Sequence, residues 1–302
     1  LDAAKLDLDD TGRTQRLALT QAYYALMLAQ DKRRLTGEAA ATYEKSLESG
    51  RLRLKTGDIA PVDLARLQID KSRADNDLRQ AEAELEKAQV ALAYFLGQEA
   101  RATELVAADP WPSLPEAAPT VARGDVAKRP DVEASRQRLA AAEAARDLAK
   151  AQKTRDVTLS VQYEHNMQGT PTNSYGFGVS VPLFLWHEYE GEIARAEADL
   201  MTARLLMERT EAQAIGSADQ AASALRSAEA RLRRLETGLL ADAERVAKAA
   251  EFAYGKGGMG LMDLLDARRT LRQVQIEAAV ARADYANALT AWRLEANYGI
   301  QP

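Results

Sequence analysis

The sequence predicts a mainly α-helical fold in which long antiparallel coiled-coil helices carry one short β-hairpin. Three observations lead to this fold class. The 302 residues contain only 17 Gly and 9 Pro, and long runs rich in Ala, Leu, Glu and Arg favour extended helices. A helical segment occurs twice at a fixed offset, and between the two copies lies a stretch in which apolar and polar residues alternate.

The duplicated segment is predicted to be a helical hairpin. Residues from about 13 to 97 align with residues from about 213 to 297 at a constant offset of 200, without gaps. The matched positions include Arg33, Arg34 and Leu35 with Arg233, Arg234 and Leu235, Glu44 with Glu244, Gly57 with Gly257, and Asp63 and Leu64 with Asp263 and Leu264. We expect the first hairpin over residues 1–96 and the second over residues 186–298, each with a Gly-containing turn between its helices.

Apolar heptad repeats predict how each hairpin packs. The returning helix of the second copy places Leu264, Leu271, Ala278, Tyr285 and Trp292 at one seam position, and Ala267, Val274, Ala281 and Ala288 at the other. The first copy places Leu64, Lys71, Leu78, Leu85 and Leu92 opposite Leu67, Ala74, Ala81 and Ala88. Such repeats indicate coiled-coil packing, and alanine lets the helices approach closely. A helical pattern from about Trp186 to Tyr254 predicts one helix of roughly 100 Å.

Two further segments lie between the copies. Residues 97–127 contain four prolines, Pro110, Pro112, Pro115 and Pro119, so we expect an irregular connection outside the coiled coils. A new helix is expected over residues 128–154. Pro130 suits the first position of that helix, and the acidic side chain of Asp131 suits its positive end.

Residues 155–185 predict a β-hairpin with two different faces. Apolar side chains alternate with small or polar ones on both arms, around a turn from Asn166 to Ser174. The face expected to meet lipid consists of Val157, Leu159, Val161, Tyr163, Tyr175, Phe177, Val179 and Val181. Each arm has about ten residues, which is the length a tilted strand needs to cross a bilayer.

The environment of this hairpin has two readings. The alternative to a membrane strand pair is a soluble hairpin packed on a helix. In a bilayer, a lone hairpin would leave the outer edges of its strands without hydrogen-bond partners. Closure of a barrel must therefore come from other copies of the chain, with or without a second hairpin upstream.

Several classes of function are excluded or disfavoured. The net charge of −5 has no basic stripe, so nucleic acid is not an expected partner. Cysteine is absent, and the two histidines, His165 and His187, are isolated, so we expect no metal site and no cofactor. No phosphate loop, nucleophile motif or carboxylate constellation predicts an enzyme. The sequence has no apolar run long enough for a transmembrane helix and no signal peptide at Leu1, and we expect its natural start to lie upstream.

Four motifs in a fixed order resemble a known family. They are Arg129 to Val132 at a helix start, Val179 to Phe184 at the hairpin end, Gly191 to Ala194 at the next helix start, and Tyr254-x-x-Gly257 followed by Met262 to Ala267. Together they resemble the second repeat of the TolC-like outer membrane factors, or outer membrane efflux proteins, over about residues 128 to 299. The stretches from Glu192 to Ala196 and from Tyr163 to Asn166 are similar to the CzcC-like heavy-metal branch. The family's first β-hairpin has no counterpart in the sequence.

The resemblance implies a homotrimer in the outer membrane. Its pooled hairpins would close one transmembrane β-barrel, and its helices would form a hollow periplasmic α-barrel with residues 97–127 at the equator. It implies a passive exit duct of a tripartite efflux system, with a periplasmic adaptor and an inner-membrane pump of the RND type as partners. Heavy-metal cations and drugs remain open as the exported substrate. The alternative from a different class is a soluble coiled-coil scaffold or interaction protein.

The resemblance also implies roles for individual residues. Asp263 and Asp266 match acidic residues that line the closed periplasmic aperture, and Asp63 and Tyr254 match positions that bond between the coiled coils. From the residues alone, the two aspartates are explained by the helix dipole and by a surface pair of Asp266 with Arg269.

The two turns have both an ordinary role and an implied one. They consist of Gly57, Asp58, Ile59 and Ala60, and of Gly257, Gly258, Met259 and Gly260. Their glycines are expected to cap helices in the left-handed conformation. The resemblance implies that the adaptor docks at these tips, and we expect Ile59 and Met259 to be exposed there.

Overall fold

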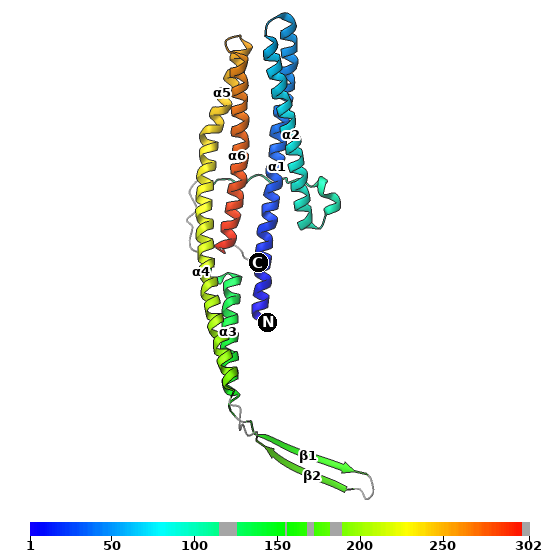
Figure 1. Ribbon diagram of the computed structural model, residues 1–302, viewed down its shortest axis with the longest axis vertical. Coiled ribbons are helices and arrows are strands. Elements are labelled where there is room, and N and C mark those ends of the chain that lie inside the picture. The colour runs from blue at the N-terminus through cyan, green and yellow to red at the C-terminus, as the bar shows by residue number, and fades with distance from the viewer. Residues whose placement is uncertain (115–125, 155, 168–171, 182–188, 298–302) are drawn as a thin grey trace. The chain divides into compact units, whose positions relative to one another are not determined.

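A computed structural model describes residues 1–114, 126–154, 156–167, 172–181 and 189–297 of the chain. The described part consists of long helices and one two-stranded antiparallel sheet (Figure 1). The prediction of a mainly helical chain with one β-hairpin is confirmed.

Contacts divide the chain into two compact units. The first, which we call the strand unit, consists of Leu1–Asp10 with Ala127–Ala214. The second, which we call the tip unit, consists of Thr11–Val126 with Ile215–Pro302. Helix α1 (Asp2–Thr56) and helix α4 (Glu190–Arg234) contribute residues to both units.

Within the tip unit, two helical hairpins have their turns at the same end (Figure 1). The first is formed by α1 and α2 (Pro61–Leu96), and the second by α5 (Leu240–Gly255) and α6 (Leu261–Glu295). The predicted seams are largely buried, because Leu264, Val274, Ala278, Ala281, Tyr285 and Trp292 in α6 and Leu67, Ala74, Ala81 and Leu92 in α2 are each at most 6% exposed. The heptad prediction therefore identified the packing face of both returning helices.

Two apolar clusters form the core of the tip unit. The cluster farther from the turns joins α4 to α6 through Ala222, Leu225, Leu232, Leu235, Ala281, Tyr285, Trp292 and Ala296. The cluster nearer the turns joins α1 and α2 to α6 through Ala40, Tyr43, Leu47, Leu67, Ala74 and Leu265. Leu265 lies in this second cluster because α6 buries a second face against the first hairpin, which the heptad pattern of a single hairpin does not predict.

Glycines in the left-handed conformation end the helices. Gly57, Gly97 and Gly257 have φ values of +78°, +63° and +76°. Gly57 N–H donates to Leu54 O at 3.1 Å, and the next amide, of Asp58, donates to Arg53 O at 2.8 Å. This pair of bonds is the Schellman motif, which satisfies carbonyls that a helix end leaves without partners. The predicted capping role of Gly57 and Gly257 is confirmed.

The predicted single helix from about Trp186 to Tyr254 needs one correction. The described helical path runs from Glu190 to Gly255, but a π-helical turn, η3 (Leu235–Leu239), separates α4 from α5. Leu240 N–H donates to Leu235 O, five residues back, instead of four. Periodicity did not predict this turn, because one wide turn leaves the helical pattern on either side intact.

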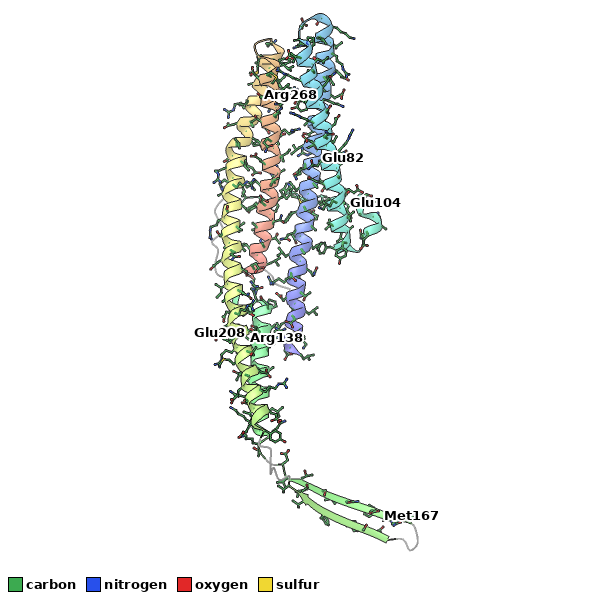
Figure 2. The ribbon with its side chains drawn as sticks, in the orientation of Figure 1. Glu82, Glu104, Arg138, Met167, Glu208 and Arg268 are labelled. Atoms are coloured by element: carbon green, nitrogen blue, oxygen red, sulfur yellow. The ribbon has the colours of Figure 1, made fainter. Side chains whose placement is uncertain are left out.

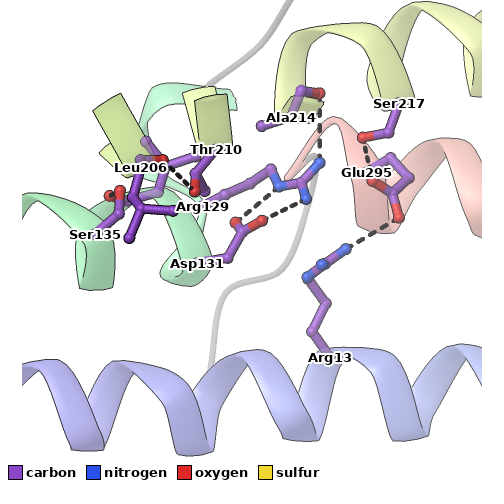
Figure 3. Close-up of polar contacts among 10 residues, drawn as sticks. Arg13, Arg129, Asp131, Ser135, Leu206, Thr210, Ala214, Ser217 and Glu295 are labelled. Atoms are coloured by element: carbon purple, nitrogen blue, oxygen red, sulfur yellow. Dashed lines mark hydrogen bonds and ion pairs between the residues drawn. The ribbon is translucent and has the colours of Figure 1, made fainter. Parts of the chain in front are cut away.

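The strand unit contains α3 (Pro130–Ala151), which lies antiparallel to the first part of α4. Lys150 pairs with Glu197 at 2.9 Å, and Arg136 pairs with Glu211 at 3.3 Å. Arg129, which is only 5% exposed, fixes the start of α3. Its guanidinium donates to the Asp131 carboxylate at 2.7 and 3.0 Å (Figure 3). Its Nη1 also donates to Ala214 O at 3.4 Å, which ties α3 to α4.

Strands β1 (Thr158–Asn166) and β2 (Thr172–Ser180) pair in one continuous antiparallel register. Leu159 pairs with Val179, Val161 with Phe177, and Tyr163 with Tyr175. The second strand begins two residues before the predicted end of the turn, because Asn173 and Ser174 pair with the first strand. Each arm has nine residues, close to the ten that were expected.

The connection that follows α2 lies against α1. After the 3-10 segment η1 (Glu99–Glu104), the chain forms a strap, residues 105–114, along the first hairpin. Asp109 accepts from Tyr23 Oη at 2.6 Å, and Trp111 Nε1 donates to Asp31 Oδ2 at 2.9 Å. The Trp111 ring also stacks on Tyr24, with ring centroids 5.9 Å apart. A second 3-10 segment, η2 (Val126–Lys128), precedes α3; Pro115 and Pro119 lie outside the described residues.

Candidate functional site

The candidate site is the end of the tip unit where the two helical turns meet. The second turn repeats the hydrogen bonds of the first, with Gly257 N–H donating to Tyr254 O at 3.0 Å and Gly258 N–H to Ala253 O at 2.9 Å. Gly57, Asp58, Ala60, Gly257, Gly258 and Gly260 are exposed. The two turns therefore present similar polar backbone surfaces.

Ile59 and Met259 are half-buried, so the expectation that both are exposed was wrong. The Ile59 side chain folds back toward its own hairpin, with its Cδ1 in van der Waals range of the space beside Gly50. An apolar residue just after a Schellman cap commonly packs against the end of the helix that it terminates. Met259 follows a cap of the same geometry.

The two aspartates at the start of α6 are exposed. Asp266 pairs with Arg269 at 3.2 Å, as the residues alone predicted. Asp263 lies in the first turn of α6, where a carboxylate is favoured by the helix dipole. Their role at an aperture stays a prediction.

Asp63 and Tyr254 have different partners in the part of the chain that the structure describes. Asp63 pairs with Arg66 at 3.7 Å within α2. The Tyr254 ring lies under the Arg53 guanidinium, 4.8 Å from the ring centroid. This cation–π contact joins α5 to α1 and so links the two hairpins. The proposed role of both residues in holding an aperture shut stays a prediction.

Three arginines of α6 make further links to the first hairpin, and the sequence analysis did not predict these links. Arg269 Nη2 donates to both carboxylate oxygens of Asp70, at 2.7 and 2.8 Å. Arg272 pairs with Asp77 at 2.8 Å. Both links run from α6 to α2, between residues about two hundred positions apart in the chain. No short-range pattern in the sequence indicates such pairs.

Arg268 reaches α1 and α5 from the same helix. Its Nη1 donates to Ser46 Oγ at 2.7 Å, and its Nη2 pairs with Glu251 at 3.0 Å. Figure 2 labels Arg268 near the end of the tip unit that carries the turns. One side chain thus contacts the outgoing helices of both hairpins.

The Arg269–Asp70 pair is the most buried of these links. The Asp70 side chain is 5% exposed, whereas that of Arg269 is 40% exposed. The hydrogen bond to Asp70 raises the pKa of the Arg269 guanidinium. A carboxylate this buried depends on its partner, because an unpaired charge in such a place is strongly destabilising.

Two pockets open to solvent border these links. A cavity of about 180 Å³ lies between α1, α5 and α6, lined by Leu35, Glu38, Ala39, Thr42, Tyr43, Glu251, Arg268, Leu271, Arg272 and Gln275. A second cavity, of about 270 Å³, shares Thr42, Glu251 and Arg268 with it and extends to Tyr254. The polar links therefore lie beside solvent and beside the apolar cluster around Leu265.

At the opposite end of the tip unit, Glu295 near the end of α6 is held by two partners. Arg13 Nη1 donates to Glu295 Oε1 at 3.1 Å, and Ser217 Oγ donates to Glu295 Oε2 at 2.7 Å (Figure 3). These bonds connect α6 to α1 and α4. Together with the apolar cluster around Trp292, they fix this end of the second hairpin.

The β-hairpin is a second candidate site, because its register gives it two chemically distinct faces. The predicted lipid-facing residues are all exposed in the single chain, from 45% for Val181 to 83% for Phe177. Tyr163 and Tyr175 end this apolar face, with ring centroids 5.1 Å apart. The other face carries Ser160, Gln162, Gly176 and Gly178. No described helix is both long and apolar enough to cross a membrane.

The described residues contain no group of three or more His, Cys, Asp or Glu side chains that could hold a metal. His165 Nδ1 lies 2.5 Å from Asn173 Oδ1 on the exposed hairpin. His187 lies outside the described residues.

Comparison with known proteins gives consistent matches. The family described as outer membrane efflux protein matches residues 126–294, which is 169 of the 302 residues. The cobalt-zinc-cadmium resistance protein CzcC of Cupriavidus metallidurans is 26% identical over 267 residues, covering 86% of this chain and 62% of the relative. The chain therefore spans less than two thirds of the length of that relative.

Solved outer-membrane channels share the fold. The CmeC channel of Campylobacter jejuni aligns with a TM-score of 0.82 and 16% identity, over 99% of this chain and 65% of that one. VceC of Vibrio cholerae aligns with a TM-score of 0.82 and 21% identity, over 99% and 74%. At these identities the likeness concerns the fold alone.

Proposed function

Because the chain belongs to the outer membrane efflux protein family, whose members are transport ducts and not enzymes, we propose that it is a channel subunit that works as a homotrimer. The pooled β-hairpins form a transmembrane β-barrel in the outer membrane, and the helices form a periplasmic α-barrel. The trimer is a passive exit duct gated at its periplasmic end. The predicted family resemblance is confirmed by the match over residues 126–294.

The observation that carries this proposal is the β-hairpin. In the described residues, β1 and β2 pair only with each other, so each strand has one open edge. An apolar face with open edges is stable in hydrocarbon only if further strands complete the hydrogen bonding. Sister subunits supply those strands, and the polar face of Ser160 and Gln162 then lines a lumen.

The gate is proposed at the helical tips. In a trimer, Asp263 and Asp266 would each occur three times around the axis, and rings of carboxylates attract cations. Tyr254 and the arginines of α6 link the second hairpin to the first, and Asp63, which pairs with Arg66 of its own helix in the single chain, is proposed to help to close the aperture. Opening requires these polar links to break, and Arg268 and Tyr254 line pockets that are open to solvent.

The partners follow from the tips and the family. We propose that a periplasmic adaptor docks on residues 57–60 and 257–260, and that an inner-membrane pump of the RND type delivers the substrate. The similarity to a cobalt-zinc-cadmium resistance protein supports heavy-metal cations as that substrate.

The test is purification in detergent followed by single-channel recording in planar bilayers. We expect a trimer that conducts with a preference for cations, and we expect Asp263→Ala with Asp266→Ala to weaken that preference or raise the conductance. The matched control is Asp242→Ala with Asp284→Ala, because these carboxylates lie away from the start of α6 and pair with Arg245 and Arg231. A water-soluble monomer that never inserts into bilayers would contradict the proposal and favour a soluble coiled-coil scaffold.

A further inference from the structure

The duplication gives an internal standard against which the π-helical turn stands out. Leu35 is followed directly by Thr36 and Gly37, whereas Leu235 is followed by Glu236 before Thr237 and Gly238. At the constant offset of 200, Thr36 and Gly37 match Glu236 and Thr237, so the two copies are equally long here but differ in sequence. The first copy remains α-helical through α1, whereas the second copy forms η3.

The two sides of the π-helical turn have different surroundings. On the packed side, Leu235 is 7% exposed within the apolar cluster, and Glu236 Oε1 accepts from Arg282 Nε of α6 at 2.8 Å. On the outer side, Leu239 is 47% exposed, and a side chain at Gly238 would meet nothing within 4 Å. In the single chain, the turn is therefore anchored on one side and open on the other.

The second hairpin is held by different kinds of contact on the two sides of η3. Away from the tips, α4 and α6 share a buried cluster that includes Leu225, Leu232 and Trp292. Toward the tips, α5 and α6 contact each other through small residues, of which Ala243, Ala247 and Ala250 are buried in α5. This half is linked to the first hairpin by the polar contacts of Tyr254 and the α6 arginines and by the buried side chain of Leu265, with Leu261 partly buried against the same cluster.

We propose that η3 is the hinge about which the half of the second hairpin nearest the tip moves when the channel opens. This inference rests on the proposed function and adds the place where the helix bends. A π turn has poorer hydrogen-bond geometry than an α turn and is a recognised site of helix bending. When the links to Asp70, Asp77, Ser46 and Arg53 break and Leu265 withdraws, α5 bends at η3 while the cluster around Trp292 stays packed.

The facing helix permits this motion. Opposite η3, α6 carries Ala278, Ala279, Ala281, Ala283 and Ala286, all at most 3% exposed. Small side chains let one helix slide along another without large steric barriers. The first hairpin has no such turn in α1 and remains the fixed reference.

The first experiment fixes the turn with a covalent staple. The chain contains no cysteine, so Arg234→Cys with Leu239→Cys creates the only thiol pair, and both positions are exposed. A short bis-alkylating linker across the pair holds the wide turn. The matched control is Arg34→Cys with Ala39→Cys in the first copy. Both pairs are placed in the Arg269→Ala background, in which the gate is weakened.

The expected result is that Arg269→Ala raises the conductance of the trimer, that the staple across η3 abolishes most of this rise, and that the staple in the first copy leaves it. An equal rise with both staples overturns the hinge but leaves the channel function standing. If no variant conducts, the proposed function fails instead.

A second measurement decides the hinge independently of conduction. Hydrogen exchange of the unmodified trimer compares the amides of residues 236–241 with those of residues 36–41. A hinge requires the second-copy amides to exchange faster, although both segments lie in long helices. Equal protection at the two places overturns the inference.

Discussion

Arg269 of the second hairpin reaches Asp70 of the first, and one guanidinium nitrogen donates to both carboxylate oxygens at 2.7 and 2.8 Å. The residues are 199 positions apart, and their link lies between the helical tips and the π-helical turn. Because the Asp70 side chain is 5% exposed, the pair makes docking of the two hairpins depend on charge.

Arg269→Ala is therefore expected to loosen the second hairpin. Removing one partner of a buried pair costs about 3–5 kcal/mol, and the partial exposure of Arg269 lowers this to about 1–2 kcal/mol. A loss of that size changes a two-state population about 5- to 30-fold. The measurement is open probability in single-channel records.

Adding Asp70→Asn to Arg269→Ala is expected to reverse part of the change in open probability, because it removes the unpaired buried charge of Asp70. Arg231→Ala provides the control, because its pair with Asp284 is exposed on both sides. A rise in open probability as large with Arg231→Ala would contradict a special role for the Asp70 link.

Gly50→Ala is expected to destabilise the first hairpin. A Cβ at Gly50 would lie 2.6 Å from Leu67 Cδ1, and Leu67 is 1% exposed and has little room to move. Overpacking of this kind costs about 1–3 kcal/mol, partly offset by the better helix propensity of alanine. At Gly37, a Cβ would lie 3.8 Å from Leu78 Cδ1, so Gly37→Ala should stabilise by about 0.5–1 kcal/mol. Chemical denaturation of both variants checks the opposite signs.

Gly257→Leu is expected to weaken adaptor binding while the trimer still forms. Its φ of +76° is unfavourable for leucine by about 1–2 kcal/mol, so the turn rearranges locally. Gly97→Leu is the matched control, because Gly97 has a φ of +63° and caps α2 at the opposite end from the tips. Binding of the purified adaptor to each detergent-solubilised trimer gives the comparison, and equal losses for the two variants would show that the tip is not the docking site.

Phe177→Lys is expected to impair insertion into the outer membrane. Phe177 lies on the apolar face, where a lysine at the bilayer midplane costs about 2–4 kcal/mol. Gln162→Lys places the same charge on the opposite face of the neighbouring strand and should be tolerated. Heat-modifiable trimer formation in lipid vesicles distinguishes the two, and equal behaviour of both variants would argue against a lipid-facing side.

Tyr43 is expected to make the tip unit sensitive to alkali. Burial raises the pKa of Tyr43 above its ordinary value of 10.0. A group whose pKa is higher in the folded state contributes stability that is complete below the unfolded pKa and is lost as the pH rises through the folded value. Stability should therefore decline above about pH 10, where tyrosine begins to ionise in the unfolded chain.

Tyr43→Phe should remove this part of the alkaline decline, because phenylalanine keeps the ring without the hydroxyl. Denaturation curves at a series of pH values measure it. An unchanged decline in the variant would place the sensitivity elsewhere.

The sequence contained enough information for the elements and for part of the candidate site. The offset of 200 located both hairpins, and the match of Gly57 with Gly257 located both turns. The alternation around Val161 and Phe177 gave the two faces of the β-hairpin. These features are local, so each is encoded by residues that are neighbours in the chain.

Other features depended on contacts between distant residues. Nothing near Asp70 indicates that its partner is Arg269, because surface aspartates of helices look the same in a sequence. The π-helical turn was missed because a single wide turn leaves the apolar repeat on either side of it intact. Ile59 was expected to be exposed because it lies in a turn. The sequence does not show that the turn directs its side chain back toward Gly50.

The strap beside α1 has a consequence for biosynthesis. Its partners Tyr23, Tyr24, Gln30 and Asp31 correspond, in the second copy, to Ser223, Ala224, Ala230 and Arg231, which lack the phenol, ring, amide and carboxylate that the strap uses. These contacts therefore belong to the first hairpin and have no equivalent on the second, although Ser113 O also accepts from Tyr285 Oη of α6. A nascent chain can complete that hairpin while the ribosome is still making the other, so two look-alike halves are kept from exchanging helices.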